Sequence, residues 1–167
     1  HQTAWMKTYF PVEFMAALMT FEMSSIEKIA EYREECKGLR IGVEPPEINT
    51  SEFDFVVESV SGDNGAAAIQ ASTNGNGGVR SAAQRKRIRF GLGAIKGVGQ
   101  KAVAAIVDER TQGGAFRNLF DFCERVDLTA VNRGTIEALI CAGAFDRTGG
   151  MRKALFDAVD RAMAVGQ

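Results

Sequence analysis

The fold is decided by residues 90–110, whose sequence is FGLGAIKGVGQKAVAAIVDER. Leu92 and Ile95 are three residues apart, which predicts one apolar face on a short first helix. Residues 97–99 are Gly-Val-Gly, and glycine permits either a positive φ or a close approach of another backbone. Residues 100–110 are good helix formers with an apolar stripe, and their alanines allow a second helix to lie close. This stretch therefore predicts two helices joined by a very tight turn.

An apolar pair, a Gly-hydrophobic-Gly turn and an Ala-rich helix form the pattern of a helix-hairpin-helix motif. Such a turn points backbone N–H groups outward at a helix N-terminus, where the helix dipole favours an anion. A nucleic-acid phosphate is the anion expected there, so binding would be largely indifferent to base sequence. The alternative is an ordinary pair of helices whose glycines serve only packing. The local pattern favours DNA binding and leaves this alternative open.

The net charge of −1 conceals an uneven distribution along the chain. Residues 1–63 hold 12 acidic and 5 basic side chains, whereas residues 64–107 hold 7 basic and no acidic ones. Residues 108–167 are nearly balanced, with 9 acidic and 8 basic side chains. We expect the positive block to surround the hairpin, as a phosphate-binding surface requires. A solvated basic loop beside an unrelated turn is the other interpretation.

The overall composition is that of a globular protein, with 46% hydrophobic and 25% charged residues in 167 positions. Three cysteines, Cys36, Cys123 and Cys141, are far apart and lie in apolar helical patterns. We expect them to be free, buried and reduced, which places the protein in the cytoplasm. The sequence contains no apolar run that would span a membrane and no signal peptide, and it starts like a piece of a longer protein.

Helical patterns precede the hairpin. Residues 1–10 predict a short helix, Pro11 begins a second, and a Ser24–Glu27 capping box begins a third. From Phe53 the pattern alternates, which predicts a strand pairing with residues 87–90 in a two-stranded ribbon. Between these strands, residues 61–86 are rich in Gly, Ser, Asn and Ala, and we expect a disordered insertion there.

A second helical pair follows the first hairpin. Its turn runs from Asp127 to Asn132, Asn132 is the expected N-cap, and no Gly-hydrophobic-Gly sequence occurs in it. We interpret the pair as a degenerate second copy that completes a compact four-helix unit, followed by a last helix from about Met151. The predicted fold class is mainly α: a tandem helix-hairpin-helix domain with a small β ribbon and N-terminal helices.

Catalytic chemistry is missing from this sequence. Glu34 and Glu35 are adjacent and point in different directions on a helix, so we interpret them as a solvated face. His1 has no evident partner, and no Cys or His spacing suits zinc. We therefore expect no catalytic residues, no metal ligands and no activity from this chain alone.

Four segments resemble the alpha (catalytic) subunit family of bacterial DNA polymerase III. QTAWMKTYFPVEFMAALMTFEM (residues 2–23) is similar to the end of that family's fingers region, and EYREECKGLRIGVEPPEIN (31–49) to the stretch after it. RIRFGLGAIKGVGQKAV (87–103) resembles its helix-hairpin-helix, and DFCERVDLTAVNRGTIEALICAGAFD (121–146) the rest of its clamp-binding domain.

The resemblance implies a replicative polymerase that extends primers by nucleotidyl transfer, with its palm aspartates and Mg²⁺ outside this sequence. It divides the chain into the end of the fingers at 1–50 and a duplex DNA-binding and clamp-binding domain at 51–167. The implied partners are primer-template DNA and, through the whole protein, the sliding clamp and other replicase subunits; no clamp-binding peptide occurs before Gln167. The implied DNA-binding residues are Lys96, Gly97, Val98, Gly99, Gln100 and Lys101, with Asn132 and Arg133 in the second turn.

Two alternatives remain open from the sequence. One is the error-prone relative of the same subunit, which shares this architecture. The other is a helix-hairpin-helix repair or scaffold module that is not a polymerase, and the fingers-like block at residues 1–50 argues against it.

Overall fold

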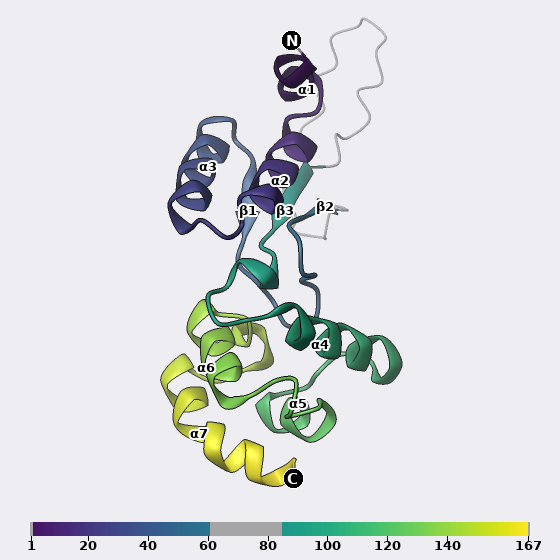
Figure 1. The fold of residues 1–167 in the computed structure, drawn as a ribbon, viewed down its shortest axis with the longest axis vertical. Coiled ribbons are helices and arrows are strands. Elements are labelled where there is room, and N and C mark those ends of the chain that lie inside the picture. The colour runs from purple at the N-terminus through teal and green to yellow at the C-terminus, as the bar shows by residue number, and fades with distance from the viewer. Residues whose placement is uncertain (1, 61–84, 167) are drawn as a thin grey trace, which may run out of the picture.

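A computed structural model of the chain describes residues 2–60 and 85–166. Three helices and a small sheet form an N-terminal part, and four further helices form a C-terminal part beneath it (Figure 1). The helices are α1 (Gln2–Tyr9), α2 (Pro11–Phe21), α3 (Ile26–Gly38), α4 (Gln100–Gly113), α5 (Leu119–Arg125), α6 (Arg133–Ala142) and α7 (Arg152–Val165). The strands are β1 (Gly42–Glu44), β2 (Val56–Val60) and β3 (Arg85–Arg89), and two 3-10 turns are η1 (Leu92–Ala94) and η2 (Asp146–Thr148). The mainly helical fold class is confirmed.

The N-terminal helices begin where the sequence provides start signals. Pro11 opens α2 at its first position, where the missing N–H costs nothing. α3 is capped by Ser25, whose hydroxyl accepts from the Lys28 N–H at 3.4 Å. The predicted cap at Ser24 is wrong by one residue, because Ser24 lies in the turn that follows α2 and Ser25 has the extended backbone of an N-cap.

The sheet has three strands in the order β1-β3-β2, with β1 parallel and β2 antiparallel to β3. The predicted pairing of the two longer strands is confirmed, but the two-stranded ribbon is wrong because residues 42–44 add a third strand. Ile41 and Val43 predict a short extended segment before Pro45-Pro46, but not that it pairs with β3. Arg85 and Lys86 belong to β3, so the predicted insertion extends two residues too far; residues 61–84 lie outside the described residues.

Two hydrophobic cores correspond to the two parts. The N-terminal core consists of Met15, Ala16, Met19, Ile29, Cys36, Ile41, Phe55 and Ile88. The larger C-terminal core contains residues of α4 to α7 together with Ile48, Leu92 and Val98. Because Val57 of β2 packs against this core and Ile88 of β3 is part of it, the strands β2 and β3 belong to the N-terminal core. The predicted domain boundary between residues 50 and 51 stays a prediction. The strands β2 and β3 follow this boundary in the sequence, but they pack with the helices that precede it.

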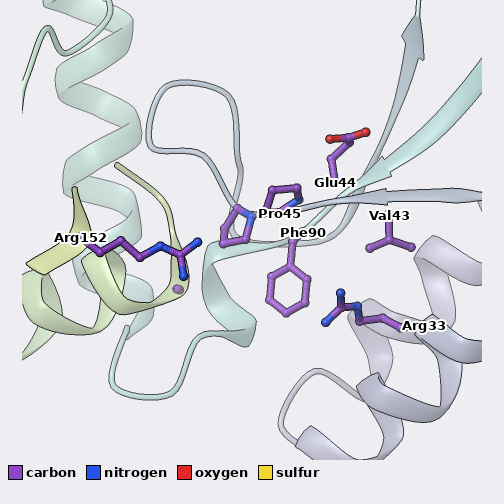
Figure 2. Close-up of a pocket in the computed structure, with 8 residues that line it drawn as sticks. Arg33, Val43, Glu44, Pro45, Phe90 and Arg152 are labelled. Atoms are coloured by element: carbon purple, nitrogen blue, oxygen red, sulfur yellow. The ribbon is translucent and has the colours of Figure 1, made fainter. Parts of the chain in front are cut away.

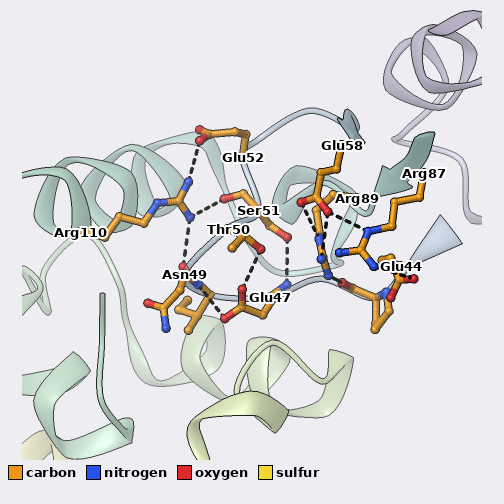
Figure 3. Close-up of polar contacts among 12 residues, drawn as sticks. Glu44, Glu47, Asn49, Thr50, Ser51, Glu52, Glu58, Arg87, Arg89 and Arg110 are labelled. Carbon is orange, nitrogen blue, oxygen red and sulfur yellow. Dashed lines mark hydrogen bonds and ion pairs between the residues drawn. The ribbon is translucent and has the colours of Figure 1, made fainter. Parts of the chain in front are cut away.

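Arg110, near the end of α4, joins the two parts (Figure 3). One guanidinium nitrogen donates to the Ile48 carbonyl at 3.1 Å and to the Ser51 carbonyl at 2.6 Å, and the other pairs with Glu52 at 2.6 Å. Ile48 is itself buried in the C-terminal core and donates its N–H to the Ala144 carbonyl at 2.9 Å. These bonds fix the loop that leads into the sheet against the helix that starts at the hairpin turn.

The first helix of the predicted hairpin is only the single 3-10 turn η1. The N–H of Leu92 donates to the Glu52 carbonyl at 2.8 Å, and the N–H of Gly93 to the Phe53 carbonyl at 3.0 Å. These partners come from the loop before β2, so they compete with helical hydrogen bonding. The second pair, α5 and α6, is fully helical, and α7 packs across both.

Candidate nucleic-acid interface

The Gly-Val-Gly turn requires glycine at only one of its two glycine positions. Gly97 has φ of +91°, whereas Gly99 has φ −87° and ψ 166°, a conformation open to any residue. Between them, the Val98 side chain is only 6% exposed and packs into the C-terminal core. Val98 also donates its N–H to the Ile95 carbonyl at 3.1 Å. Val98 therefore anchors the turn from inside. Its N–H is already used within the turn, so the expectation that the backbone N–H groups of this turn point outward does not hold for Val98.

The N-terminus of α4 begins directly at this turn without a side-chain cap. Gly99 occupies the N-cap position, and the first turn of the helix contains no acidic residue. By contrast, side chains of Ser25, Asn118 and Asn132 cap α3, α5 and α6. Within the described residues, the N–H groups of Gly97 and Gly99 also have no backbone acceptor. Gly97 and Gly99 are both exposed, so several N–H donors without an internal acceptor lie together at the positive end of a helix dipole.

Lys96 and Lys101 flank the turn and supply its accessible charge. Both side chains are exposed, and neither makes an ion pair with any described residue. Lys101 lies in the first turn of α4, where a cation opposes the helix dipole. A helix start with a lysine and no acidic residue is unfavourable by itself and becomes favourable when an external anion binds.

The arginines of the sheet do not add to this charge, although they belong to the positive block. Arg89 is 1% exposed, binds Glu58 at 2.9 Å and donates to the Pro45 carbonyl at 2.9 Å (Figure 3). Arg87 pairs with Glu58 at 3.2 Å and with Glu44 at 3.4 Å, and Lys86 pairs with Glu13. The expectation that the whole block forms a phosphate-binding surface is wrong for these residues, because acidic partners distant in sequence neutralise them.

The Glu58 carboxylate is held by this network. Burial raises its pKa, but hydrogen bonds and charge attraction from Arg89 and then Arg87 outweigh burial and lower the pKa below its usual value. The carboxylate therefore stays ionised at neutral pH and keeps both arginines on the sheet. This arrangement supports the fold and leaves phosphate binding to other residues.

The polar side chains of the second predicted turn already have hydrogen-bond and ion-pair partners in α6 and α7. The Asn132 side-chain oxygen accepts from the Thr135 N–H at 2.9 Å and so caps α6, as predicted. Arg133 pairs with Glu137 at 2.8 Å and with Asp160 of α7 at 2.5 Å. Both residues are exposed, but their polar groups already have internal partners. The structure therefore leaves this turn less able to receive a phosphate than the first.

Thr135 joins the two turns and was not anticipated from the sequence. Its hydroxyl lies 3.2 Å from the Gly97 carbonyl and 3.1 Å from the Asn132 side-chain oxygen, and the residue is only 5% exposed. A Cβ added to Gly97 would also contact Ala138 of α6 at 3.7 Å. The two hairpins thus lie side by side with Thr135 between them. The only sequence signal for this contact is a hydroxyl residue three positions after an Asn N-cap.

A family model described as the helix-hairpin-helix motif matches residues 40–155, which is more than half of the chain. This chain belongs to the helix-hairpin-helix family. The matched range starts near β1 and contains the uncapped Gly-Val-Gly turn, the capped second turn and α6.

Several proteins that resemble the chain along nearly all of its length are named DNA polymerase III subunit alpha. The protein from Vibrio cholerae is 43% identical over 98% of the chain, and that from Pseudomonas aeruginosa is 44% identical over 89%. The protein from Escherichia coli strain K12 is 38% identical over 98% of the chain. The chain spans only 11–12% of the length of these relatives.

Two of the three cysteine thiols of this helix-hairpin-helix protein are buried in its cores. Burial raises the pKa of the Cys36 and Cys123 thiols to about 11, so neither is a nucleophile at neutral pH. Cys141 is exposed, so the expectation that all three cysteines are buried is wrong. Among residues 2–60 and 85–166, no group of His, Cys, Asp and Glu side chains is arranged to hold a metal ion. No helix in those ranges is long and apolar enough to cross a membrane.

Proposed function

We propose that this chain is part of a bacterial replicative DNA polymerase and binds the backbone of the primer-template duplex behind the active site. Similarity to proteins named DNA polymerase III subunit alpha extends over 89–98% of the chain. It therefore includes the residues before position 40, which the helix-hairpin-helix model does not cover. This favours a polymerase segment over an isolated repair or scaffold module.

The observation that carries the proposal is the uncapped start of α4 between Lys96 and Lys101, neither of which pairs with a residue that the structure describes. A phosphate at the turn accepts hydrogen bonds from the N–H groups of Gly97, Gly99 and the first turn of α4. Lys96 and Lys101 then add charge from either side of that phosphate. None of these groups reads a base edge, so the contact positions the duplex without specifying its sequence.

The activity of the whole polymerase follows from the same proposal. Primer extension by nucleotidyl transfer would use palm carboxylates and Mg²⁺ in other parts of the polymerase, whereas this segment holds the product duplex. The sliding clamp and other replicase subunits would be partners of the whole protein, which would act in the cytoplasm. Asn132 and Arg133 would make at most a secondary contact, because each already has internal partners.

Fluorescence anisotropy with two labelled duplexes of unrelated sequence tests the DNA contact. We expect the parent chain to bind both equally and to lose affinity steeply as salt rises, because bound counterions are released from DNA. The Lys96→Ala/Lys101→Ala variant should bind both more weakly and flatten the log–log salt slope by about two units.

Two matched variants make the test specific. Glu27 lines the groove beside the turn together with Lys96 and Gly97, so Glu27→Gln should strengthen binding. Arg161→Ala removes an exposed charge on α7 and should leave binding unchanged. The proposal fails if the double lysine variant is folded and binds duplex like the parent at every salt concentration.

A further inference from the structure

A second candidate site lies in a cleft of about 450 Å³ between the two parts of the molecule. Its walls come from α3, from β1 with the following prolines, from the end of β3, and from the ends of α6 and α7. Figure 2 shows Arg152 and Arg33 extending from opposite sides, with the ring of Phe90 between them. The volume is within the range of about 300–1,000 Å³ that is usual for sites of small organic ligands.

The cleft has more positive charge than its own residues neutralise. Within the described residues, the exposed Arg33 side chain makes no hydrogen bond or ion pair. Arg152 binds Asp146 through two of its nitrogens, at 3.0 and 2.6 Å, while its third contacts only the Cys141 carbonyl at 3.5 Å. Glu44 is paired with Arg87 and points away from the ring (Figure 2). Guanidinium donors are therefore available to an anion from both sides.

The wall between the arginines is apolar and includes an aromatic ring. Phe90 is half-buried and packs edge-to-face on Phe55, with 4.8 Å between ring centroids. Phe55 thus holds the ring in place, and Pro45 and Pro46 continue the apolar wall beside it. An aromatic side chain next to cationic groups is the usual arrangement for stacking a base while its phosphate is bound. An acidic peptide would use the arginines but has no need of the ring.

We propose that this cleft binds one nucleotide of single-stranded nucleic acid, with the base on Phe90 and the phosphate on Arg33 and Arg152. The site is distinct from the duplex contact, because α6 separates them. The N-terminal end of α6 contacts the Gly-Val-Gly turn through Thr135, whereas Ala142 at its other end lines the cleft. Ten residues of helix span about 15 Å, so a strand leaving the turn reaches the cleft within a few nucleotides.

The test uses the 167-residue chain and a fluorescein-labelled thymidine oligonucleotide, followed by anisotropy. Arg33→Ala removes a side chain that has no partner in the described part of the chain, and it should weaken binding by about fivefold or more. Phe90→Leu keeps apolar bulk and removes the ring, and it should weaken binding by a similar factor. An abasic oligonucleotide of equal length should bind the parent more weakly than the thymidine oligonucleotide does. It should bind Phe90→Leu and the parent with equal affinity. Circular dichroism establishes that each variant is folded.

Two comparisons separate this proposal from its alternatives. Lys96→Ala/Lys101→Ala should impair duplex binding and leave binding of the thymidine oligonucleotide intact, so the two sites can fail independently. Arg161→Ala is the charge control. The cleft proposal is overturned if folded Arg33→Ala and Phe90→Leu bind the thymidine oligonucleotide like the parent, or if the lysine variant abolishes that binding. It is equally overturned if the abasic oligonucleotide binds as tightly as the thymidine oligonucleotide, or if polyglutamate competes as well as unlabelled thymidine oligonucleotide.

Discussion

Replacing Gly99 by Asp should stabilise the protein and abolish its binding to duplex DNA. Gly99 already has the extended backbone of an N-cap, and an added Cβ there meets no atom within 4 Å. The new carboxylate would accept from the free N–H groups of α4, in the position proposed for a phosphate oxygen. One substitution therefore moves stability and function in opposite directions.

The gain in stability has three parts. Asp is better than Gly as an N-cap by a few tenths of a kcal/mol, and a negative charge at a helix N-terminus contributes about 0.3–1 kcal/mol. Removing glycine also lowers the entropy of the unfolded chain, worth about 0.4–1 kcal/mol. Together these amount to about 1–2 kcal/mol, which raises the melting temperature by about 2–8 °C for a chain of this length. Thermal unfolding followed by circular dichroism measures the shift.

Duplex affinity of the same preparation should fall at least about tenfold at low salt, since the N–H groups are occupied and a negative charge is added. Gly99→Asn separates these causes because it caps the helix without charge, and it should also weaken binding. Met151→Asp is the matched control: it places the same cap on α7, whose N-terminus also lacks one, and should stabilise without affecting DNA. The reasoning is refuted if Gly99→Asn is stabilised and yet binds duplex like the parent.

Three further predictions concern the turn, the sheet and the thiols. Gly97→Ala should lower stability by about 1–2 kcal/mol in urea unfolding, because φ of +91° is strained for an L-residue, and Gly97→Asn should lose less. The free energy of unfolding should fall as pH drops below about 4.5, the ordinary value for Glu58, because its pKa is lowered in the folded state and its contribution is lost on protonation; Glu58→Gln should make this fall shallower. A thiol reagent at neutral pH should modify Cys141 at once in the native protein and Cys36 and Cys123 only after unfolding.

Each of these has an outcome that would contradict it. Equal stability of Gly97→Ala and the parent would mean that the turn tolerates a side chain in its present conformation. If the free energy of unfolding of Glu58→Gln falls at acid pH as steeply as that of the parent, the pairing of Glu58 with Arg89 contributes nothing to folding. Rapid modification of two or three thiols in the native chain would place a buried cysteine at the surface.

The tight turn at residues 97–99 and the helix that follows it were predictable from the sequence, because these features are local. Gly-Val-Gly followed by a run of helix formers predicts where α4 begins, and Pro11 and Asn132 mark two more helix starts. The alternating pattern around Phe53 and Arg87 predicts that β2 and β3 pair. These features depend on preferred backbone angles and on periodicity within a few residues, so a single sequence contains them.

Contacts between distant residues decided the rest. Arg89 meets Glu58 and Arg110 meets the Ile48 carbonyl across 31 and 62 positions, and no spacing rule relates such residues. The contacts of Lys86, Arg87 and Arg89 determine that these three residues of the basic block support the sheet, and among the described side chains Lys96 and Lys101 are the accessible charge at the turn.

What the sequence determined by itself is the mainly helical class and the tight turn at residues 97–99, because turn and helix preferences act along the chain. Only the tertiary structure decided which donors of that turn are free, since the Val98 N–H is taken and Thr135 holds the Gly97 carbonyl. Only it added the third strand and the cleft around Phe90. Burial and pairing depend on which residues come into contact when the chain folds, and the spacing of residues along the sequence does not predict contacts between distant segments.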